Sequence, residues 1–307
     1  FGSPEEDSLT AALDAGRQAL EAQLGVTTQT AEHTASQESC AEAVRTLTQG
    51  GCQVIVAGSG QLEPWIEAAA GEYPEVVFLQ LDGSTVGENL APFSGRMQEP
   101  EYLAGMAAGL KTQTGRIGYL AYAPSYRNIL LANAFALGVQ AANPEATVEL
   151  IWTGAWYDPD LERSAALELL DRGCDVLGQE LGSPAALQAA AQRGAWAVGS
   201  GVSGAEAAAD AYLTAPVWDF SGYLTGQVQR IIDGSWTSAR YEGGLAEGLV
   251  ALDALSANCA EGTAEQLQTA QEALAAGTLE IFSGPLYDNQ GKLRLGEGET
   301  MTAGELA

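Results

Sequence analysis

The sequence predicts an α/β protein of two lobes, each built on a parallel, doubly wound sheet. Short apolar runs alternate with helix-like stretches, as such sheets require. The chain has 307 residues, which is long for one core and comfortable for two lobes. The segment LTQGGCQVIVAGSG (47–60) also has a counterpart in LLDRGCDVLGQELG (169–182), each turning at Gly-Cys into a short apolar run. We interpret this pair as one βαβ unit used once in each lobe, although such units are common and a chance resemblance stays open.

The first part of the chain predicts helices and strands in alternation. The run 8–25 has apolar residues at helical spacing and Gly25 as a glycine stop. A later helix has Pro64 in its favoured first turn. Lobe 1 is therefore expected to contain helices over 8–25, 39–51 and 64–74, and strands over 52–58 and 75–83.

A long helix and a second series of elements follow, and the pattern loosens after residue 213. Asp158 is the expected N-cap of one helix, with Pro159 at its first position. The expected helices cover 99–115, 128–144, 158–173, 184–193, 221–234 and 263–278. The expected strands cover 116–124, 146–154, 174–180, 195–201 and 247–255. We also expect an extended crossover over 212–218 and a hairpin over 281–299. We divide the chain into lobe 1 (1–116), lobe 2 (117–213) and a crossover, return to lobe 1 and tail (214–307).

The composition argues against several classes of function. Forty acidic and 13 basic residues give a net charge of −27, so a basic nucleic-acid face is not expected. The single histidine, His33, and the absence of CxxC and DxDxDG motifs predict no metal site. No GxSxG, P-loop or HExxH motif is present, so we expect neither an enzyme nor a cofactor. Cys52 and Cys174 are expected as small buried hydrophobes, while a Cys40–Cys52 bridge stays open.

Five segments carry a resemblance to a known family: GEYPEVVFLQLDG, EPEYLAGMAAGLKTQTGRIGYLA, NAFALGVQAANPEATVELIWTGAWYDP, ALELLDRGCDVLGQE and IFSGPLYDNQGKLRLGEGE. Together they resemble the basic membrane protein family, the PnrA-like solute-binding lipoproteins. The resemblance implies a type I periplasmic-binding-protein fold, with a purine nucleoside or purine base captured between two lobes by hinge closure. It also implies delivery to an ABC permease at the outer face of the cell membrane or in the periplasm. The lipidated cysteine that anchors such proteins would lie in a removed N-terminal segment.

Three departures from the family pattern bear on the ligand. The family begins with an apolar strand, of which only Phe1 remains here. Its first loop carries paired aspartates and then Ser-Phe-Asn, whereas Leu9 and Thr10 stand here in place of the aromatic and the amide. Nucleoside binders also place an aspartate on the ribose hydroxyls where this chain has Ser200 and Gly201. The alternative function is therefore a ligand-sensing or interaction module that has lost nucleoside binding, and a nucleoside-processing enzyme is a third class.

Ligands of open α/β sheets bind beyond the carboxyl ends of the strands, which is where we place the candidate residues. Trp156, in the turn TGAWYDP, is the predicted stacking residue, and its alternative role is to plug the core of a lobe. Glu180 is predicted to accept a proton from a ring nitrogen or amine, and its alternative is a solvated loop carboxylate. Asp219 has the same two interpretations as Glu180. Ser59 and Gln61 otherwise form an ordinary turn, and Trp218 otherwise packs the hinge. The remaining predicted ligand-binding residues are Tyr126, Ser200, Asp7 and Leu9.

Overall fold

The computed structural model describes residues 2–301, and it confirms an α/β fold with parallel sheets. The described chain forms two compact units, the first from residues 2–96 and 218–250, the second from 97–217 and 251–301. The sequence placed the first boundary after residue 116. The contacts place it one helix earlier, because α4 (Gln98–Lys111) packs along α5 (Tyr126–Ala142) of the second unit. Phe1, named above as the remnant of a first strand, lies outside the described residues.

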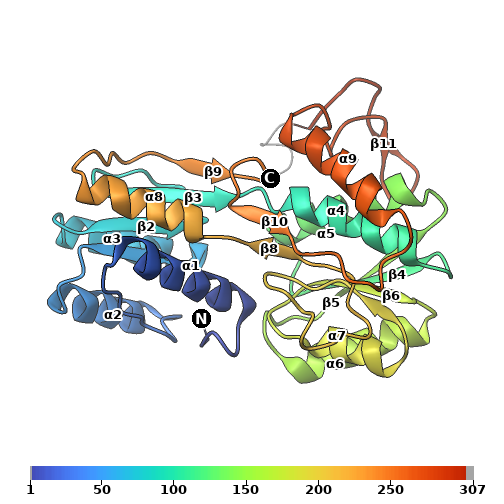
Figure 1. The fold of residues 1–307 in the computed structure, drawn as a ribbon, viewed down its shortest axis with the longest axis horizontal. Coiled ribbons are helices and arrows are strands. Elements are labelled where there is room, and N and C mark those ends of the chain that lie inside the picture. Colours follow the sequence, from blue (N-terminus) through green and yellow to red (C-terminus); the bar gives the residue numbers. More distant parts are fainter. Residues whose placement is uncertain (1, 302–307) are drawn as a thin grey trace. The chain divides into compact units, whose positions relative to one another are not determined.

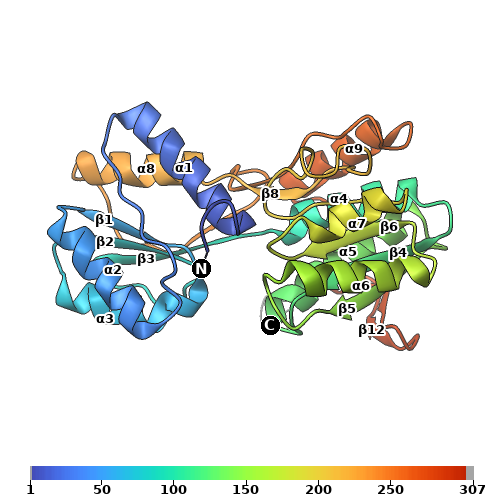
Figure 2. The ribbon, with the colours of Figure 1, turned by 90° about the horizontal axis from the view of Figure 1, so that it is seen from below.

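Unit 1 is built on a four-stranded parallel sheet in the order β1-β2-β3-β9. Figure 2 shows α1 and α8 on one face of this sheet and α2 and α3 on the other. The strands are β1 (Val54–Ala57), β2 (Val77–Leu81), β3 (Leu90–Gly95) and β9 (Tyr241–Gly243); the helices are α1 (Ser8–Leu24), α2 (Gln37–Gln49), the 3₁₀ helix η1 (Gly60–Leu62), α3 (Glu63–Glu72) and α8 (Ser221–Ile232). Because helices cover both faces, these short strands are mostly apolar, as parallel strands usually are.

The helices of unit 1 begin and end where local chemistry favours it. Asp7 caps α1 by accepting the Thr10 amide at 2.8 Å, and Gly25 ends this helix in the left-handed conformation at φ 65°. The core on the α2 and α3 face is formed by buried side chains such as Ile55, Ile66 and Phe78. Capping residues therefore determine where α1 begins and ends, and burial of apolar side chains holds α2 and α3 on the sheet.

Unit 2 is built on a second parallel sheet in the order β5-β4-β6-β7. In Figure 1, α4 and α5 cover one face and α6 and α7 the other. The strands are β4 (Arg116–Ala121), β5 (Thr147–Trp152), β6 (Val176–Glu180) and β7 (Trp196–Ala197), and the remaining helices are α6 (Pro159–Asp171) and α7 (Ala185–Gln192). β8 (Pro216–Trp218) pairs with β10 (Val250–Leu252) in a separate two-stranded sheet. The chain then forms α9 (Thr263–Ala275), which packs on α4. The hairpin of β11 (Leu286–Tyr287) and β12 (Leu293–Leu295) follows.

Two glycines bring α4 and α5 into direct backbone contact. A Cβ on Gly105 would lie 2.0 Å from the Phe135 carbonyl oxygen, and one on Gly138 would lie 1.9 Å from the Tyr102 carbonyl oxygen. Larger residues cannot be placed at either position without separating the helices. Gly105, which lies in the family-like segment EPEYLAG, is therefore a packing residue of unit 2.

The four cysteines are free thiols, so the bridge between Cys40 and Cys52 that the sequence left open is not formed. Cys40 and Cys174 are buried, and burial raises the pKa of the Cys174 thiol to about 11. Among residues 2–301, no helix combines the length and the apolarity that a membrane crossing requires.

Candidate functional site

The carboxyl ends of the unit 2 strands bring aromatic and polar side chains to one edge of the sheet. Tyr122 directly follows β4, and Trp156 lies in the turn after the neighbouring β5. Their rings meet edge to face, with centroids 5.8 Å apart and an interplanar angle of 89°. Glu180 ends β6 on the other side of β4, and Ser200 follows β7. Three of the predicted site residues therefore lie at one edge of this sheet.

The turn that carries Trp156 is held by a set of hydrogen bonds. The Trp156 carbonyl oxygen accepts the Gly182 amide at 2.9 Å, and a Cβ on Gly182 would lie only 3.0 Å from the indole nitrogen. Asp158 caps α6 by accepting the amides of Asp160 and Leu161, as the sequence predicted. The indole therefore lies across the glycine that follows β6, and it is partly exposed.

Behind this turn, a fully buried carboxylate joins two loops. Glu162 accepts the Asp158 amide at 3.1 Å and the Ser183 hydroxyl. The Ser183 hydroxyl also accepts the Ala185 amide at the start of α7. Burial raises the pKa of Glu162 from its usual value. The loops after β5 and β6 are thus connected through one buried side chain.

Glu180 and Ser200 form a buried polar pair at the ends of β6 and β7. The Ser200 hydroxyl donates to Glu180 Oε2 at 3.0 Å, and the two residues are 7% exposed each. A carboxylate at a strand end accepts N–H or O–H groups, so this pair suits a ligand that donates hydrogen bonds. The solvated loop carboxylate that the sequence offered as an alternative for Glu180 does not describe this buried side chain.

A third buried carboxyl group, which sequence reasoning missed, lies near Glu180. Glu101 of α4 is 1% exposed, and its Oε1 makes no hydrogen bond of good geometry within the described residues. Burial first, and then the charge of Glu180, raise the pKa of Glu101 well above its usual value. The pKa of Tyr119 is also raised, mainly by burial and then by the charges of Glu101 and Glu180. The charge of Arg127 lowers the pKa of both Tyr119 and Glu101, but by less.

This environment predicts that Glu101→Gln raises the unfolding temperature at neutral pH. The folded-state pKa of Glu101 lies above the unfolded value of about 4.5, so this carboxyl destabilises the fold increasingly as pH rises above that value. Glutamine has the same shape and no charge, so it removes the effect. Thermal unfolding from pH 4.5 to 8 should show a gain for the variant that disappears toward the acidic end.

The matched control is Glu145→Gln, which removes an exposed carboxyl from the same unit. It should change the unfolding temperature little at any pH in this range. If Glu101→Gln instead destabilised the protein at neutral pH, the buried carboxylate would be ionised and held by compensating groups.

The non-aromatic candidate residues of unit 1 lie at the starts of its helices. Asp7 is 5% exposed and caps α1, and Leu9 follows it in the first turn of that helix. Ser59 caps η1 by accepting the amide of the exposed Gln61 at 3.3 Å. Asp219 is exposed, lies one residue before the N-cap of α8, which is Phe220, and accepts the Ser221 amide at 3.0 Å. The sequence had named these residues as ligand contacts, and in the structure Asp7 and Ser59 cap helices while Asp219 accepts an amide in the first turn of α8.

The last two predicted residues are aromatic. Trp218 stacks on Phe220 with centroids 5.0 Å apart, and a Cβ on Gly95 would lie 2.3 Å from its ring. This is the packing role that the sequence offered as its alternative. Tyr126 is the first residue of α5 and is 45% exposed. Ligand contact by either residue stays a prediction.

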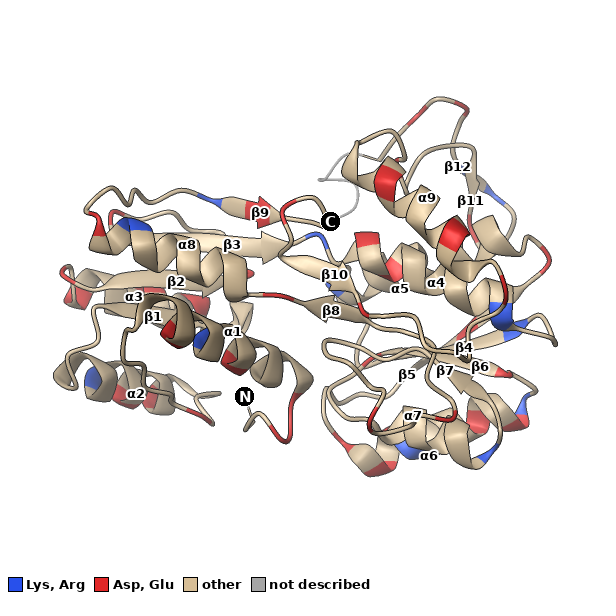
Figure 3. Ribbon diagram, viewed as in Figure 1, with Lys and Arg blue, Asp and Glu red and all other residues tan. Residues whose placement is uncertain are grey.

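The acidic character extends over the described surface of both units. Figure 3 shows Asp and Glu on most helices and loops, with far fewer Lys and Arg. Within residues 2–301, no group of three or more His, Cys, Asp or Glu side chains is placed to hold a metal ion. The net charge of −27 gives the protein a negative electrostatic potential, which repels anionic solutes.

Residues 2–279 match the family described as ABC transporter substrate-binding protein PnrA-like. The chain belongs to this family. As a PnrA-like substrate-binding protein, it is 30% identical over 302 residues to the "Purine-binding protein BAB2_0673" of Brucella abortus, a match that covers 97% of this chain and 86% of the relative. It is also 34% identical over 242 residues to the "Putative ABC transporter glucose-binding protein TsgA13" of Haloferax volcanii, covering 79% of this chain. This match spans 62% of the Haloferax protein's length.

The fold of this PnrA-like protein is also that of solved solute-binding proteins. A solute-binding protein of an ABC transporter system from Conexibacter woesei superposes with a TM-score of 0.79 at 22% sequence identity, covering 91% of this chain and 95% of the other. The predicted fold class is thereby confirmed. The Brucella relative is named for a purine and the Haloferax relative for glucose. The names of the relatives therefore do not identify the solute, which has to be inferred from the chemistry of the site.

Proposed function

We propose that this chain is the solute-capturing component of an ABC importer and that its solute is a purine nucleoside or a purine base. The observation that carries the proposal is the placement of Trp156 and of the buried Glu180–Ser200 pair at the same edge of the unit 2 sheet. An indole provides a flat apolar face for a ring, and a buried carboxylate accepts its N–H groups. The Brucella relative named as purine-binding supports the same class of ligand.

The Glu180–Ser200 pair also bears on the missing ribose aspartate. The sequence offers Ser200 where nucleoside binders are expected to have an aspartate. In this structure Ser200 donates to a carboxylate that ends the neighbouring strand. We propose that Glu180 supplies the acceptor for the ligand's hydroxyl or N–H groups from this adjacent position.

The second candidate solute is a neutral hexose, favoured by the name of the Haloferax relative. An aromatic face and a carboxylate also suit a sugar, whose ring carries C–H groups on its faces and hydroxyls at its edge. The charge of −27 disfavours phosphorylated forms of either class, because they would approach a negative surface. Closure of the two units on the solute, delivery to an ABC permease and an N-terminal lipid anchor stay predictions.

A thermal-shift screen tests the proposal. The purified chain would be heated with adenosine, guanosine, inosine, adenine, hypoxanthine, glucose or AMP. A solute present at about 100 times its Kd stabilises the folded state by about 2.7 kcal/mol, which is a shift of about 5 °C for a protein of this size. We expect at least one neutral purine to give this shift and AMP to give none.

The other outcomes separate the alternatives. A shift with glucose and with no purine would make the protein a sugar binder and would overturn the purine proposal. No shift with any of these compounds would favour a sensing or interaction module that has lost nucleoside binding. Chromatography of each incubated solute would detect turnover and so identify an enzyme.

A further inference from the structure

Two carboxyl groups lie close together at the candidate site, and their surroundings decide which of them is charged. Glu101 is 1% exposed, and no hydrogen bond of good geometry reaches its Oε1 within the described residues. Burial, and then the charge of Glu180, raise the pKa of Glu101 well above its usual value. Glu180, in contrast, accepts the Ser200 hydroxyl at 3.0 Å, and such a bond favours the ionised form of a carboxyl group. Glu101 therefore holds a proton, and the negative charge lies on Glu180.

The ionised Glu180 side chain presents acceptors alone to a solute. A carboxylate has two oxygens with about four acceptor positions between them and no donor. The Ser200 hydroxyl occupies one position on Oε2, and both residues are 7% exposed, so this carboxylate is largely shielded from water. A solute that binds there has to bring N–H or O–H groups, because a lone pair set against the buried charge would lower its affinity.

The predicted stacking surface lies next to the same stretch of chain. Gly182, two residues after Glu180, donates its amide to the Trp156 carbonyl oxygen at 2.9 Å. A Cβ on Gly182 would lie 3.0 Å from the indole nitrogen. Stacking uses the faces of a flat ring and leaves its edge for hydrogen bonds. Glu180 is therefore placed to meet the edge of a base that stacks on Trp156.

Purine nucleosides differ in what the edges of their bases offer to a carboxylate. The base of guanosine carries an N1–H and a 2-amino group side by side, so two parallel donors face the two carboxylate oxygens. The base of inosine has the N1–H alone. The base of adenosine has a lone pair at N1 beside its 6-amino group, so one donor is lost and a lone pair faces a negative charge. A carboxylate therefore binds guanosine best, inosine less well and adenosine least.

We infer that Glu180 makes this protein selective for guanine-type purines, by accepting the N1–H and 2-amino groups of a base that stacks on Trp156. Resting on the proposed purine solute, this assignment places Glu180 on the base and not on the ribose. In a stacked nucleoside the ribose leaves the ring at N9, on the side away from N1, so it lies away from Glu180. Ser200 is a positioning residue, because its hydroxyl holds one oxygen of the carboxylate.

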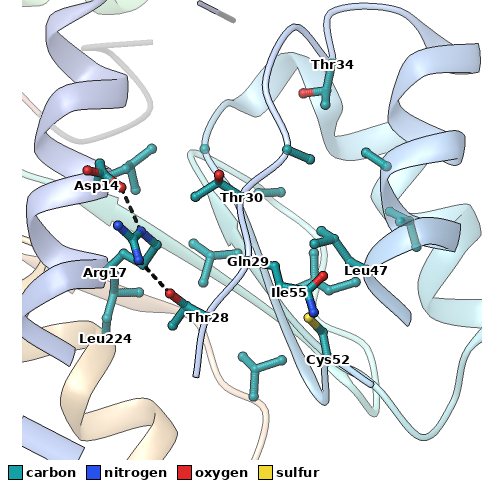
Figure 4. A pocket seen from close by; sticks show the side chains of 18 of the residues that line it. Asp14, Arg17, Thr28, Gln29, Thr30, Thr34, Leu47, Cys52, Ile55 and Leu224 are labelled. Atoms are coloured by element: carbon teal, nitrogen blue, oxygen red, sulfur yellow. Dashed lines mark hydrogen bonds and ion pairs between the residues drawn. The ribbon is translucent and has the colours of Figure 1, made fainter. Parts of the chain in front are cut away.

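Unit 1 has a carboxylate of its own beside a cavity of about 620 Å³, which is lined by parts of α1, of β1 and of residues 26–34. Figure 4 shows Asp14 of this cavity beside Arg17, which also contacts Thr28. Arg17 Nε donates to Asp14 Oδ1 at 2.7 Å, and Gln18 Nε2 donates to Asp14 Oδ2 at 2.6 Å. Protein groups thus bind both oxygens of Asp14, so this carboxylate is poorly suited to bind a base and provides a matched control.

The test is a comparison of guanosine, inosine and adenosine by calorimetric titration. We expect the unaltered chain to bind guanosine about 10- to 100-fold more tightly than adenosine, with inosine between them. Glu180→Gln should reverse this order, because the amide keeps one acceptor and gains an N–H that donates to N1 of adenosine. Ser200→Ala should weaken guanosine binding about 5-fold and keep the order. Asp14→Asn makes the same chemical change in unit 1 and should alter neither affinity nor order.

The order of affinities separates this inference from the proposed function. Equal or tighter binding of adenosine by the unaltered chain would overturn the guanine assignment and leave a purine-binding protein. So would an equal loss of all three nucleosides in Glu180→Gln, which would place this side chain on the ribose. A reversal in Asp14→Asn but not in Glu180→Gln would place the base in the unit 1 cavity. Binding of no purine at all would overturn the proposed function itself. If Glu180→Gln does not fold, the order for the unaltered chain and for Ser200→Ala still decides.

Discussion

Replacing Trp156 with alanine is expected to weaken purine binding about 10- to 100-fold and to leave the protein folded. Stacking of a base on an aromatic side chain contributes about 1–3 kcal/mol by alanine substitution. The indole is partly exposed beside Tyr122 at the edge of the unit 2 sheet, so its removal opens little of the core. Calorimetric titration with the purine that gives the largest thermal shift would measure the change without relying on tryptophan fluorescence.

Two further variants of the same turn complete this experiment. Tyr157→Ala removes the adjacent aromatic, which is 45% exposed, and should leave affinity nearly unchanged. Trp156→Phe keeps an aromatic face and should retain most of the binding. An unaltered affinity of Trp156→Ala, together with an unaltered unfolding temperature, would show that the indole does not contact the solute.

Raising the KCl concentration from 0.1 to 2 M is expected to raise the unfolding temperature by about 10 °C. The chain carries 40 acidic and 13 basic residues, so like charges repel one another in the compact state. The screening length falls from about 10 Å at 0.1 M to about 3 Å at 1 M, which removes most of this repulsion. Circular dichroism melts across a series of KCl concentrations would measure the dependence.

A charge-reduced variant provides the control for the salt effect. The exposed residues Glu67, Glu75, Glu145, Glu206 and Glu261 would be changed together to glutamine. The variant should unfold at a higher temperature than the parent at 0.1 M KCl and should respond less to added salt. A melting temperature that does not change with salt in either protein would mean that the acidic surface does not limit stability.

Much of the fold follows from local patterns, because helix ends and buried strands have chemical signatures. Gly25, and Asp158 with Pro159, mark helix ends within a residue or two of the observed positions. β3 was not predicted, because Pro92 interrupts an apolar run that begins after a long polar loop. β9 was not predicted either, because a three-residue strand containing Glu242 has no apolar pattern of its own and depends on pairing with β3.

The candidate site was only partly predictable, for a reason that lies in the sheet order. Trp156, Glu180 and Ser200 could be placed at strand ends from the alternation of elements alone. That they come to the same edge, with Glu180 and Ser200 on neighbouring strands, follows from the order β5-β4-β6-β7, which no local pattern determines. Glu101 was read as part of a helix motif, and only the packing of α4 in unit 2 shows that its carboxyl group is buried near Glu180.

The bonded turn around Trp156 has a consequence for the kinetics of solute capture. The Gly182 amide and the buried Glu162 hold this turn on two sides, so the indole that we propose as the stacking surface is in place before a solute arrives. Little loop freedom remains to be lost on association at this point. Differences in affinity among related solutes should therefore appear mainly in how long each one stays bound, and much less in how fast it arrives.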